Sequence, residues 1–556
     1  MKGLINMEKY KGTKAITLVA LVITIVILLI LAGISVSILT NTGIFQKAKD
    51  AKGASENAEK EEKSLLSEYE QEIIKQDSNG IWDGSVNKPN LMTGMKAINF
   101  KFDETKGEYE TNREDINTNN ENKCWYDYGS KKWANAQTED GSMWVWIPRY
   151  AYKVVYNDPN DKSKGGKFDI VFLIGITDNY IDDNGNIQTA QRQTEKNQVI
   201  ETDATKTDKY TVHPAFTNES NIDYANGGWK KELTGIWVAK FEAGYFDKEK
   251  EKGKIKSSSD NYSKGKSLTI ENKYEDARNY LDGIYGEETK SIKYPTFQGE
   301  KYSMNFINNN DAFNISRKLT ESKNIYGFDD SITDSHLMKN SEWGTIVYLG
   351  ESKYGLDGEN IRINNVNVED NTNFVYAMTG YAAKKEDEKD TKINNNVYKW
   401  TTKDGTVASN TGTIYGVYDM SGGVWERIAT LINNENSSLH TYGESIISAL
   451  NNGKASEYVM VYKNEEKNVQ NADEVGKINY NLNIQVYGDA MAETSSSGIG
   501  NTGWNQDYSS FARGDTPFFT RGGGCWDTSN AGLYGFFRTA GINSYDAGFR
   551  PVLVAK

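Results

Sequence analysis

Cysteine and histidine are scarce in this chain, and their scarcity limits the sites that it can build. Among 556 residues there are 2 cysteines and 3 histidines, too few for a disulfide framework or for a tetrahedral zinc site. The histidines, His213, His336 and His440, stand far apart and none belongs to a metal-ligand motif. Cys124 and Cys525 either form one bridge or stay free. We therefore expect neither a metal site nor a cofactor.

Positive charge is also in short supply. Lys and Arg number 64 against 77 Asp and Glu, so the formal net charge is -13 at pH 7. Binding to nucleic acid needs a basic field that gathers phosphates, so no nucleic-acid partner is expected. Aromatic residues are abundant by contrast, with 12 Trp and 34 Tyr beside 50 Gly. This composition predicts a loop-rich, largely β body whose core depends on aromatic side chains.

One long apolar run lies near the N-terminus. Residues 16–39 carry no charged side chain, and a helix of about 24 residues crosses a hydrocarbon core of about 30 Å. The preceding lysines are Lys2, Lys9, Lys11 and Lys14. By the positive-inside rule they predict a single-pass protein of the cell membrane, with a cytoplasmic N-terminus and an extracellular C-terminal domain. A secretory signal peptide is the alternative, although the run is long for one.

The same stretch reads KGTKAITLVALVITIVILLILAGISVSIL, and it resembles the N-terminus of type IV pilins and pseudopilins. The resemblance implies cleavage by a prepilin peptidase between Ala15 and Ile16, and packing against other pilin-like subunits. Two residues depart from the family pattern, since Ala15 replaces the usual Gly and Ala20 replaces the usual Glu. The predicted N-terminal parts are a basic leader (1–15), a transmembrane helix (16–40) and a stalk helix (41–77).

The remainder of the chain is predicted to be one large domain with a lead-in. Polar clusters without a clear period fill residues 78–139, so we expect an extended approach to the domain, which spans 140–556. Runs rich in aromatic and β-branched residues predict strands at 143–156, 167–176 and 232–246. The first of these runs contains a proline, which predicts a strand pair or a bent edge strand.

Alternation within the strand at 232–246 predicts which of its side chains are buried. Side chains along a strand point to opposite faces in turn. Ile236, Val238 and Phe241 are expected to face the core, whereas Lys240 and Glu242 are expected to face solvent.

Helical spacing returns at residues 336–355. Asn340 or Ser341 is the expected N-cap of this helix, and Trp343 begins its apolar stripe. His336 is interpreted as a structural residue near the cap rather than as a ligand.

The segment GVYDMSGGVWERIA, residues 416–429, combines a glycine turn with charged and aromatic side chains. Asp419 can bond to local backbone, and Trp425 can fill a core below the turn. Glu426 beside a core tryptophan predicts a buried carboxylate, which requires a cationic partner. Arg521 and Arg550 are the two candidates.

Several landmarks then combine into a second resemblance. MWVWIP, ELTGIWVAKFEAG, LMKNSEWGTIVYLG, GVYDMSGGVWE and RGGGCW…GFRPVL resemble the formylglycine-generating-enzyme and sulfatase-modifying-factor domain, a variant of the C-type lectin fold. The resemblance implies an α+β chain in which the long transmembrane and stalk helix precedes a large, loop-rich lectin-type domain. The oxidases of that family bind copper through a cysteine pair after the RGG turn. Here DTSNAGLYGFFR follows Trp526 without a cysteine, so the resemblance implies a protein that is not an enzyme.

The ending of the chain resembles the C-terminal variable region of proteins diversified by retroelements, in which a fixed framework displays diverse loop residues. By that resemblance the framework is Arg521, Gly522, Gly523, Gly532, Leu533, Phe536, Gly548, Phe549, Arg550 and Pro551, supported by Trp343, Asp419, Trp425 and Glu426. The expected ligand-binding set is Cys525, Trp526, Asp527, Ser529, Phe537, Arg538, Asn543, Tyr545 and Asp546.

The leading functional prediction is a non-catalytic adhesin of the bacterial cell surface, which binds an extracellular protein or glycan and is held in the membrane by residues 16–39. One alternative is a minor pilin or pseudopilin that forms part of a filament or secretion system. A formylglycine-generating-type oxidase is less favoured, and an ordinary loop region without a selected ligand also stays open.

Overall fold

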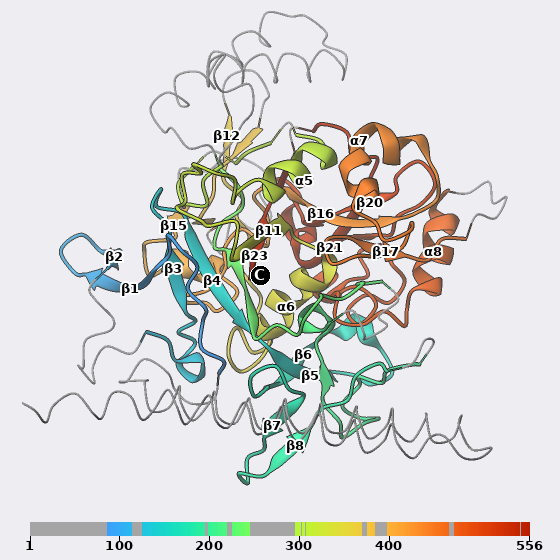
Figure 1. The fold of residues 1–556 in the computed structure, drawn as a ribbon, viewed down its shortest axis with the longest axis horizontal. Helices are drawn as coiled ribbons and strands as arrows, with labels where there is room; N and C mark the ends of the chain where they lie inside the picture. Colours follow the sequence, from blue (N-terminus) through green and yellow to red (C-terminus); the bar gives the residue numbers. More distant parts are fainter. Residues whose placement is uncertain are drawn as a thin grey trace, which may run out of the picture. The chain divides into compact units, whose positions relative to one another are not determined.

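The structure is a computed structural model, and it describes most of the C-terminal part of the chain. The described residues are 86–113, 125–194, 198–218, 225–244, 295–301, 303–305, 307–369, 375–383, 397–465, 472–544 and 546–556. All of them belong to one unit, Ser67–Lys556. They are mostly sheet, with four α-helices among them (Figure 1).

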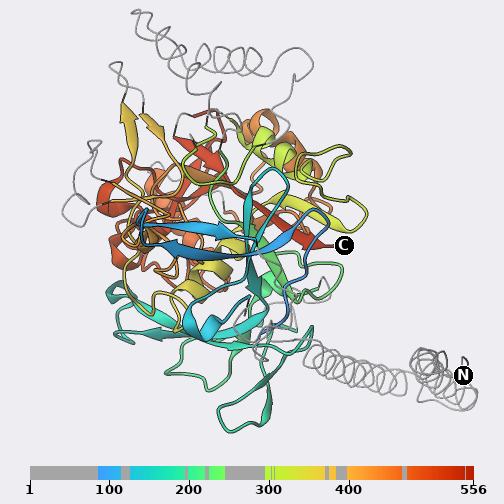
Figure 2. The same ribbon diagram turned by 90° about the vertical axis from the view of Figure 1, so that its left-hand side faces the viewer.

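The first large sheet has seven strands, and its neighbours pair antiparallel. In spatial order they are β11 (Thr333–Leu337), β23 (Pro551–Ala555), β10 (Gly235–Ala239), β4 (Met143–Pro148), β3 (Asn135–Gln137), β1 (Lys96–Asp103) and β2 (Glu108–Asn112). Figure 2 shows the β1–β2 hairpin in blue. The last strand of the chain, β23, thus lies inside this sheet, between β11 and β10.

The second large sheet carries most of the C-terminal segment. Its strands run in the order β17 (Met460–Tyr462), β16 (Trp425–Ile432), β20 (Phe518–Gly522), β21 (Gly532–Thr539), β19 (Ser509–Ser510) and β18 (Ile499–Gly500), and β22 (Ala547–Phe549) pairs parallel with β16. A single residue, Arg550, separates β22 from β23. The chain therefore passes from the second sheet to the first at that residue.

Smaller sheets complete the β structure. One has three strands, β6 (Gly166–Phe172), β5 (Tyr150–Tyr156) and β9 (Thr211–Val212). The two-stranded sheets are β7 (Asn179–Ile181) with β8 (Ile187–Thr189), β12 (Asn367–Glu369) with β13 (Val375–Ala377), and β14 (Tyr381–Ala382) with β15 (Tyr398–Lys399). The stretch 143–156, predicted as a strand pair or a bent edge strand, forms two strands, since β4 ends at Pro148 and β5 begins at Tyr150. They belong to different sheets and do not pair with each other.

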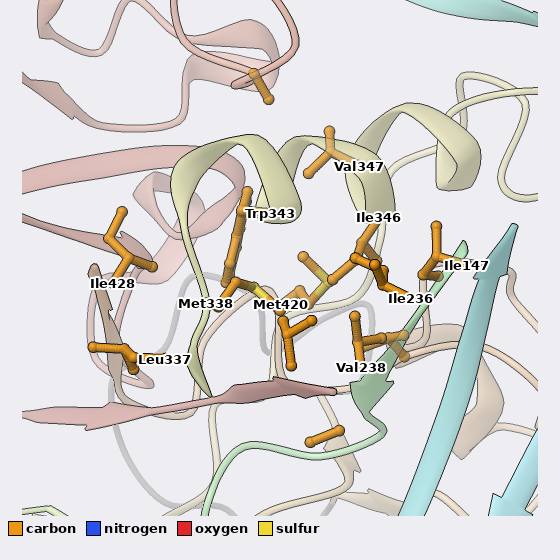
Figure 3. Close-up of a cluster of buried hydrophobic side chains, with 14 of the residues drawn as sticks. Ile147, Ile236, Val238, Leu337, Met338, Trp343, Ile346, Val347, Met420 and Ile428 are labelled. Carbon is orange, nitrogen blue, oxygen red and sulfur yellow. The ribbon is translucent and has the colours of Figure 1, made fainter. Parts of the chain in front are cut away.

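The helices are short, and one of them lies in the core. They are α5 (Asn309–Arg317), α6 (Asn340–Gly350), α7 (Ser437–Ser448) and α8 (Ala472–Leu482). Every residue of α6 is buried. Figure 3 shows Trp343 and Ile346 of α6 near Ile236 of β10 and Ile428 of β16, and all four belong to one hydrophobic cluster. This helix thus joins the two large sheets through apolar contacts.

The predicted helix at 336–355 begins later than expected. Residues 333–337 form β11 instead, since they pair with β23 along their whole length. The residue before the helix is Lys339 rather than Asn340 or Ser341, and its backbone N–H donates to the Glu342 carboxylate at 2.8 Å. Pairing with a distant strand therefore outweighs the local helical pattern.

Two side chains predicted to face solvent are fully buried. Lys240 and Glu242 are both 0 % exposed. The Lys240 ammonium donates to the Asn135 side-chain oxygen at 2.8 Å and to the carbonyls of Ile414 at 2.6 Å and Gly416 at 2.8 Å. A period of two places Lys240 and Glu242 on the same side of the chain as Ile236 and Val238, and both residues follow β10, which ends at Ala239. The alternation itself therefore gave no reason to expect them in solvent.

The predicted α+β fold with a long transmembrane and stalk helix is contradicted, and so is the single-pass membrane location. Nowhere in the described residues is a helix long and apolar enough to cross a membrane. The longest, α7, has 12 residues, which gives about 18 Å at about 1.5 Å per residue, short of a hydrocarbon core of about 30 Å. The leader, transmembrane and stalk segments (1–15, 16–40 and 41–77) lie outside the described residues.

The lead-in region at 78–139 also differs from its prediction. Its described parts contain β1, β2 and β3, which belong to the first large sheet. The segment KAINFKFD of β1 alternates, with Ile98 and Phe100 buried on one face and Lys101 exposed on the other. Because β1 pairs with β2 and β3, and β3 pairs with β4, this region is part of the first large sheet.

Candidate functional site

The candidate site is a pocket of about 450 Å³ beside the second large sheet. It is lined by Trp425, Arg427, Tyr508, Thr520, Trp526, Asp527, Asn530, Phe537, Thr539, Ile542, Ser544, Asp546 and Ala547. The volume falls within the range of small-molecule sites, about 300–1,000 Å³. Its walls come from β16, β20 and β21, which Figure 1 shows side by side, and from the segments that follow β20 and β21.

Strand register explains why side chains that are distant in the sequence meet here. Arg427 of β16 lies opposite Thr520 of β20, and Thr520 lies opposite Phe537 of β21. These three residues therefore form one row across three neighbouring strands. Trp425 lies two positions before Arg427, so both side chains project from the same face of β16.

Aromatic side chains form one wall of the pocket. The rings of Trp425 and Phe537 have their centroids 5.7 Å apart at an interplanar angle of 42°. The rings of Tyr508 and Phe537 are 5.9 Å apart at 40°. Trp526 also lines the pocket and packs against a small cluster that contains buried Cys525. The tilted arrangement leaves ring faces that a ligand can contact.

Two carboxylates line the same pocket. Asp527 accepts a hydrogen bond from the backbone N–H of Gly524 at 2.7 Å, and Asp546 accepts one from the hydroxyl of Ser544. Burial raises the pKa of Asp527 above its usual value, and the charge of Asp546 acts in the same direction, while hydrogen bonds from Gly524 and Trp425 oppose them. The two acids are thus close enough to repel each other when both are ionised.

A buried cation lies at the base of the pocket. Arg427 is 1 % exposed. Its guanidinium donates to the side-chain oxygen of Asn309 at 2.5 Å and to the carbonyl of Ile542. Burial lowers the pKa of Arg427 to about 10, although the charges of Asp546 and Asp311 act against this. Within the described residues, its Nε has no hydrogen-bond partner.

The sequence predicted part of this pocket. Trp526, Asp527, Phe537 and Asp546 of the expected ligand-binding set do line it. Trp425 was predicted as a framework residue, and it lines the pocket as well. Arg427, Tyr508 and Thr520 were not predicted, since only the pairing of β16 with β20 and β21 brings them to the site.

Other predicted ligand residues lie elsewhere. Cys525 is 1 % exposed and packs with Ala377 and Val424, so it is not a surface residue. Arg538 does not line the pocket. Its guanidinium donates to the hydroxyl of Ser510, and its Nη2 lies 3.6 Å from Oδ1 of Asp473. Asn543 is partly exposed in the segment after β21 but does not line the pocket.

The remaining predicted residues lie in a short turn or outside the described residues. Ser529 belongs to a short 3₁₀ turn, η8 (Thr528–Asn530). Tyr545, Cys124 and the predicted processing residues Ala15 and Ile16 lie outside the described residues. Among the residues that the structure does describe, no three His, Cys, Asp or Glu side chains gather as a metal ion would require.

Beneath the pocket, a buried ion pair supports strand β16. Arg550 donates from Nε to Oε2 of Glu426 at 3.0 Å and from Nη2 to Oε1 at 2.6 Å. Burial raises the pKa of Glu426, which the Arg550 charge opposes. Of the two predicted partners, Arg550 is therefore the one that Glu426 uses. Arg521 instead donates to Asn340 and to backbone carbonyls, including that of Asp489 at 2.8 Å.

Glycine conformations set the path of the segment that carries Trp526 and Asp527. Gly522, the last residue of β20, and Gly523, which follows it, have φ values of +88° and +80°. A Cβ on Gly523 would lie 2.4 Å from the Cβ of Ala531. Asp419 has a positive φ of 63° and accepts from Asn364 and the Gly380 N–H, each at 2.8 Å. The glycines thus set the turn after β20, and the Asp419 contacts hold the turn that precedes β16.

Comparison with protein-family models finds no match to this chain. Comparison with curated proteins finds no match either. The three resemblances drawn from the sequence therefore stay predictions.

Proposed function

We propose that this chain is a non-catalytic binding protein whose pocket beside β16, β20 and β21 takes up a glycan or protein ligand. The observation that carries the proposal is the composition of the pocket. Aromatic rings and polar groups converge on one cavity from strands and from turns held by buried contacts. Such a combination supplies apolar area together with a few oriented hydrogen-bonding groups.

Preorganisation favours binding at this site. The row Arg427–Thr520–Phe537 lies on paired strands, and strand residues keep their positions better than residues of free loops. The turn after β20 is held by the Cys525 N–H, which donates to the Gly423 carbonyl at 2.8 Å. A ligand therefore meets a site that needs little ordering, which reduces the entropic cost of association.

The chemistry of Cys525 favours binding over thiol-based catalysis. A nucleophile or a soft-metal ligand at cysteine is the thiolate. Burial raises the pKa of the Cys525 thiol well above its usual value, and the charges of Glu242 and Asp527 act in the same direction. This thiol therefore stays protonated at neutral pH and does not act as a nucleophile or a metal ligand. We assign the function to binding in the adjoining pocket instead.

The proposal is tested by ligand screening with the full chain. Glycan arrays and purified protein panels identify a ligand, and titration calorimetry measures its affinity for the wild type and for Trp526→Ala and Phe537→Ala. We expect each substitution to weaken binding at least tenfold. Ile484→Ala is the matched control, because Ile484 is an exposed apolar residue outside the pocket. Ligands that bind both pocket variants as tightly as the wild type would contradict the assignment.

A further inference from the structure

The charges that line the pocket are unequal in number. Asp527 and Asp546 contribute two carboxylates, whereas Arg427 contributes the one guanidinium among the lining residues. Tyr508 is the remaining titratable residue of the lining. When both acids are ionised the lining therefore carries a net negative charge, which favours a cationic ligand group over an anionic one.

Arg427 does not cancel this preference at the pocket surface. Its side chain is almost fully covered, and its guanidinium donates to Asn309 and to the Ile542 carbonyl. Asp527 and Asp546, by contrast, are both partly exposed. A ligand that enters the pocket thus reaches the carboxylates before it reaches the guanidinium.

The two carboxylates also destabilise each other. The charge of Asp546 raises the pKa of Asp527, in addition to the larger effect of burial. A cation placed between them would relieve this repulsion and would form charge-assisted hydrogen bonds with both.

The aromatic wall adds attraction of the same sign. Trp425, Phe537 and Tyr508 lie within 6 Å of one another in consecutive pairs, at 5.7 Å and 5.9 Å. The faces of aromatic rings carry negative potential and attract ammonium groups within about 6 Å. A cationic ligand is attracted both by the carboxylates and by the ring faces, whereas a neutral ligand lacks the charge that these groups attract.

We propose that the pocket recognises a sugar that carries a cationic amino group, that is, a hexosamine without its acetyl group. This inference rests on the proposed function and specifies its ligand. The ammonium lies between Asp527 and Asp546, and an apolar face of the sugar ring lies on Trp526 or Phe537.

The neutral lining favours a sugar over the ammonium of a lysine side chain. Thr520, Asn530, Thr539 and Ser544 supply hydroxyl and amide groups around the aromatic wall. A lysine stem has no hydroxyl to match them, whereas a sugar ring carries several. The volume of about 450 Å³ is also that of a site for a whole small molecule rather than for one side chain.

Titration calorimetry of the full chain at pH 6, where the amino sugar is protonated, tests the proposal with matched ligands. These are a glucosamine trimer, an N-acetylglucosamine trimer and a glucose trimer of the same linkage, beside a lysine-containing tripeptide. We expect the glucosamine trimer to bind at least tenfold more tightly than any of the other three. Its affinity should fall at high salt, while that of the neutral trimers should not.

Two substitutions locate the effect. Asp527→Asn and Asp546→Asn should each reduce the preference for the glucosamine trimer over the N-acetylated trimer to less than threefold. Asp473→Asn is the control, because Asp473 is an exposed acid outside the lining. Circular dichroism confirms that each variant is folded. If a variant does not fold, the salt dependence of glucosamine binding to the wild type still tests the proposal.

The outcomes separate this inference from the proposed function. Equal affinity for the three trimers, lost in Trp526→Ala, would overturn cation recognition and support binding in the pocket. Tighter binding of the lysine tripeptide would overturn the choice of a sugar. If none of the four probes binds while Trp526→Ala abolishes binding of another ligand, the inference is wrong and the proposed function stands.

Discussion

Arg550 and Glu426 form a buried, two-point ion pair at the residue where the chain leaves one large sheet for the other. The guanidinium of Arg550 contacts both carboxylate oxygens, at 3.0 and 2.6 Å, and it also donates to the carbonyls of Ala239 and Tyr418, at 2.7 and 2.8 Å. Ala239 ends β10 in the first sheet, and Glu426 lies on β16 in the second. One side chain thus links the two sheets next to the pocket residue Trp425.

Replacing Arg550 by methionine should destabilise the fold strongly. The substitution leaves the Glu426 carboxylate buried without its cation, and breaking a buried pair in this way costs about 3–5 kcal/mol. Urea unfolding monitored by tryptophan fluorescence measures the loss. Adding Glu426→Gln should recover part of it, because the uncompensated charge is then gone. The exposed pair Lys167–Asp357, at 3.0 Å, supplies the control, and Lys167→Met should have a much smaller effect.

The protein should become less stable as the pH rises from about 5 to 8. Burial raises the pKa of Glu351 to about 8 and that of Asp507 to about 7. The folded state therefore holds protons that the unfolded chain has already released above its ordinary carboxyl pKa values. The stabilising contribution is present at low pH and is lost as the pH rises through the raised values.

Urea unfolding at pH 5, 6.5 and 8 checks this trend. Glu351→Gln should flatten it and should stabilise the protein at pH 8, since the glutamine never ionises. Glu321→Gln, a change at an exposed glutamate, should leave the slope as it is. An unfolding free energy that rises across this range would contradict the prediction.

Gly523→Ala should lower both stability and ligand affinity. The residue has a φ of +80°, and an added Cβ would lie 2.4 Å from the Cβ of Ala531. The left-handed conformation alone costs about 1–2 kcal/mol with a side chain, and the clash displaces the turn that carries Trp526. Thermal unfolding and calorimetry measure the two effects. Gly514→Ala is the control because nothing lies within 4 Å of its Cβ position, so it should be nearly neutral.

Lys240→Met should destabilise the protein although it removes a buried charge. The ammonium donates three hydrogen bonds, to Asn135 Oδ1 and to the carbonyls of Ile414 and Gly416. Burial lowers the pKa of Lys240, but three acceptors require three protons, so the folded state keeps the ammonium. Methionine leaves all three acceptors unsatisfied, at about 1–3 kcal/mol each. Chemical unfolding should show a loss far larger than that of Lys230→Met, at a mostly exposed lysine.

Local patterns in the sequence predicted the parts of the structure that depend on near neighbours. The proline at the end of MWVWIP separates β4 from β5, and the apolar stripe that begins at Trp343 lies on α6. Trp526 and Asp527, which follow the glycine turn after Arg521, line one side of the pocket. Each of these features follows from the conformational preferences of a few adjacent residues, which a sequence displays directly.

Other features depended on which distant segments pair, and only the tertiary structure decided them. His336 lies in β11 rather than in a helix because β23 offers it a partner strand. Lys240 is buried because distant residues supply three acceptors. Arg521 lies opposite Glu426 on β20, yet Glu426 pairs with Arg550, because the Arg521 guanidinium donates to Asn340 and to backbone carbonyls instead. The sequence by itself determined an aromatic, acidic, β-rich chain with a glycine-hinged C-terminal segment. The register of β16, β20 and β21 decided that Arg427, Thr520 and Phe537 share one pocket, since register is set by packing over the whole sheet and not by any single strand.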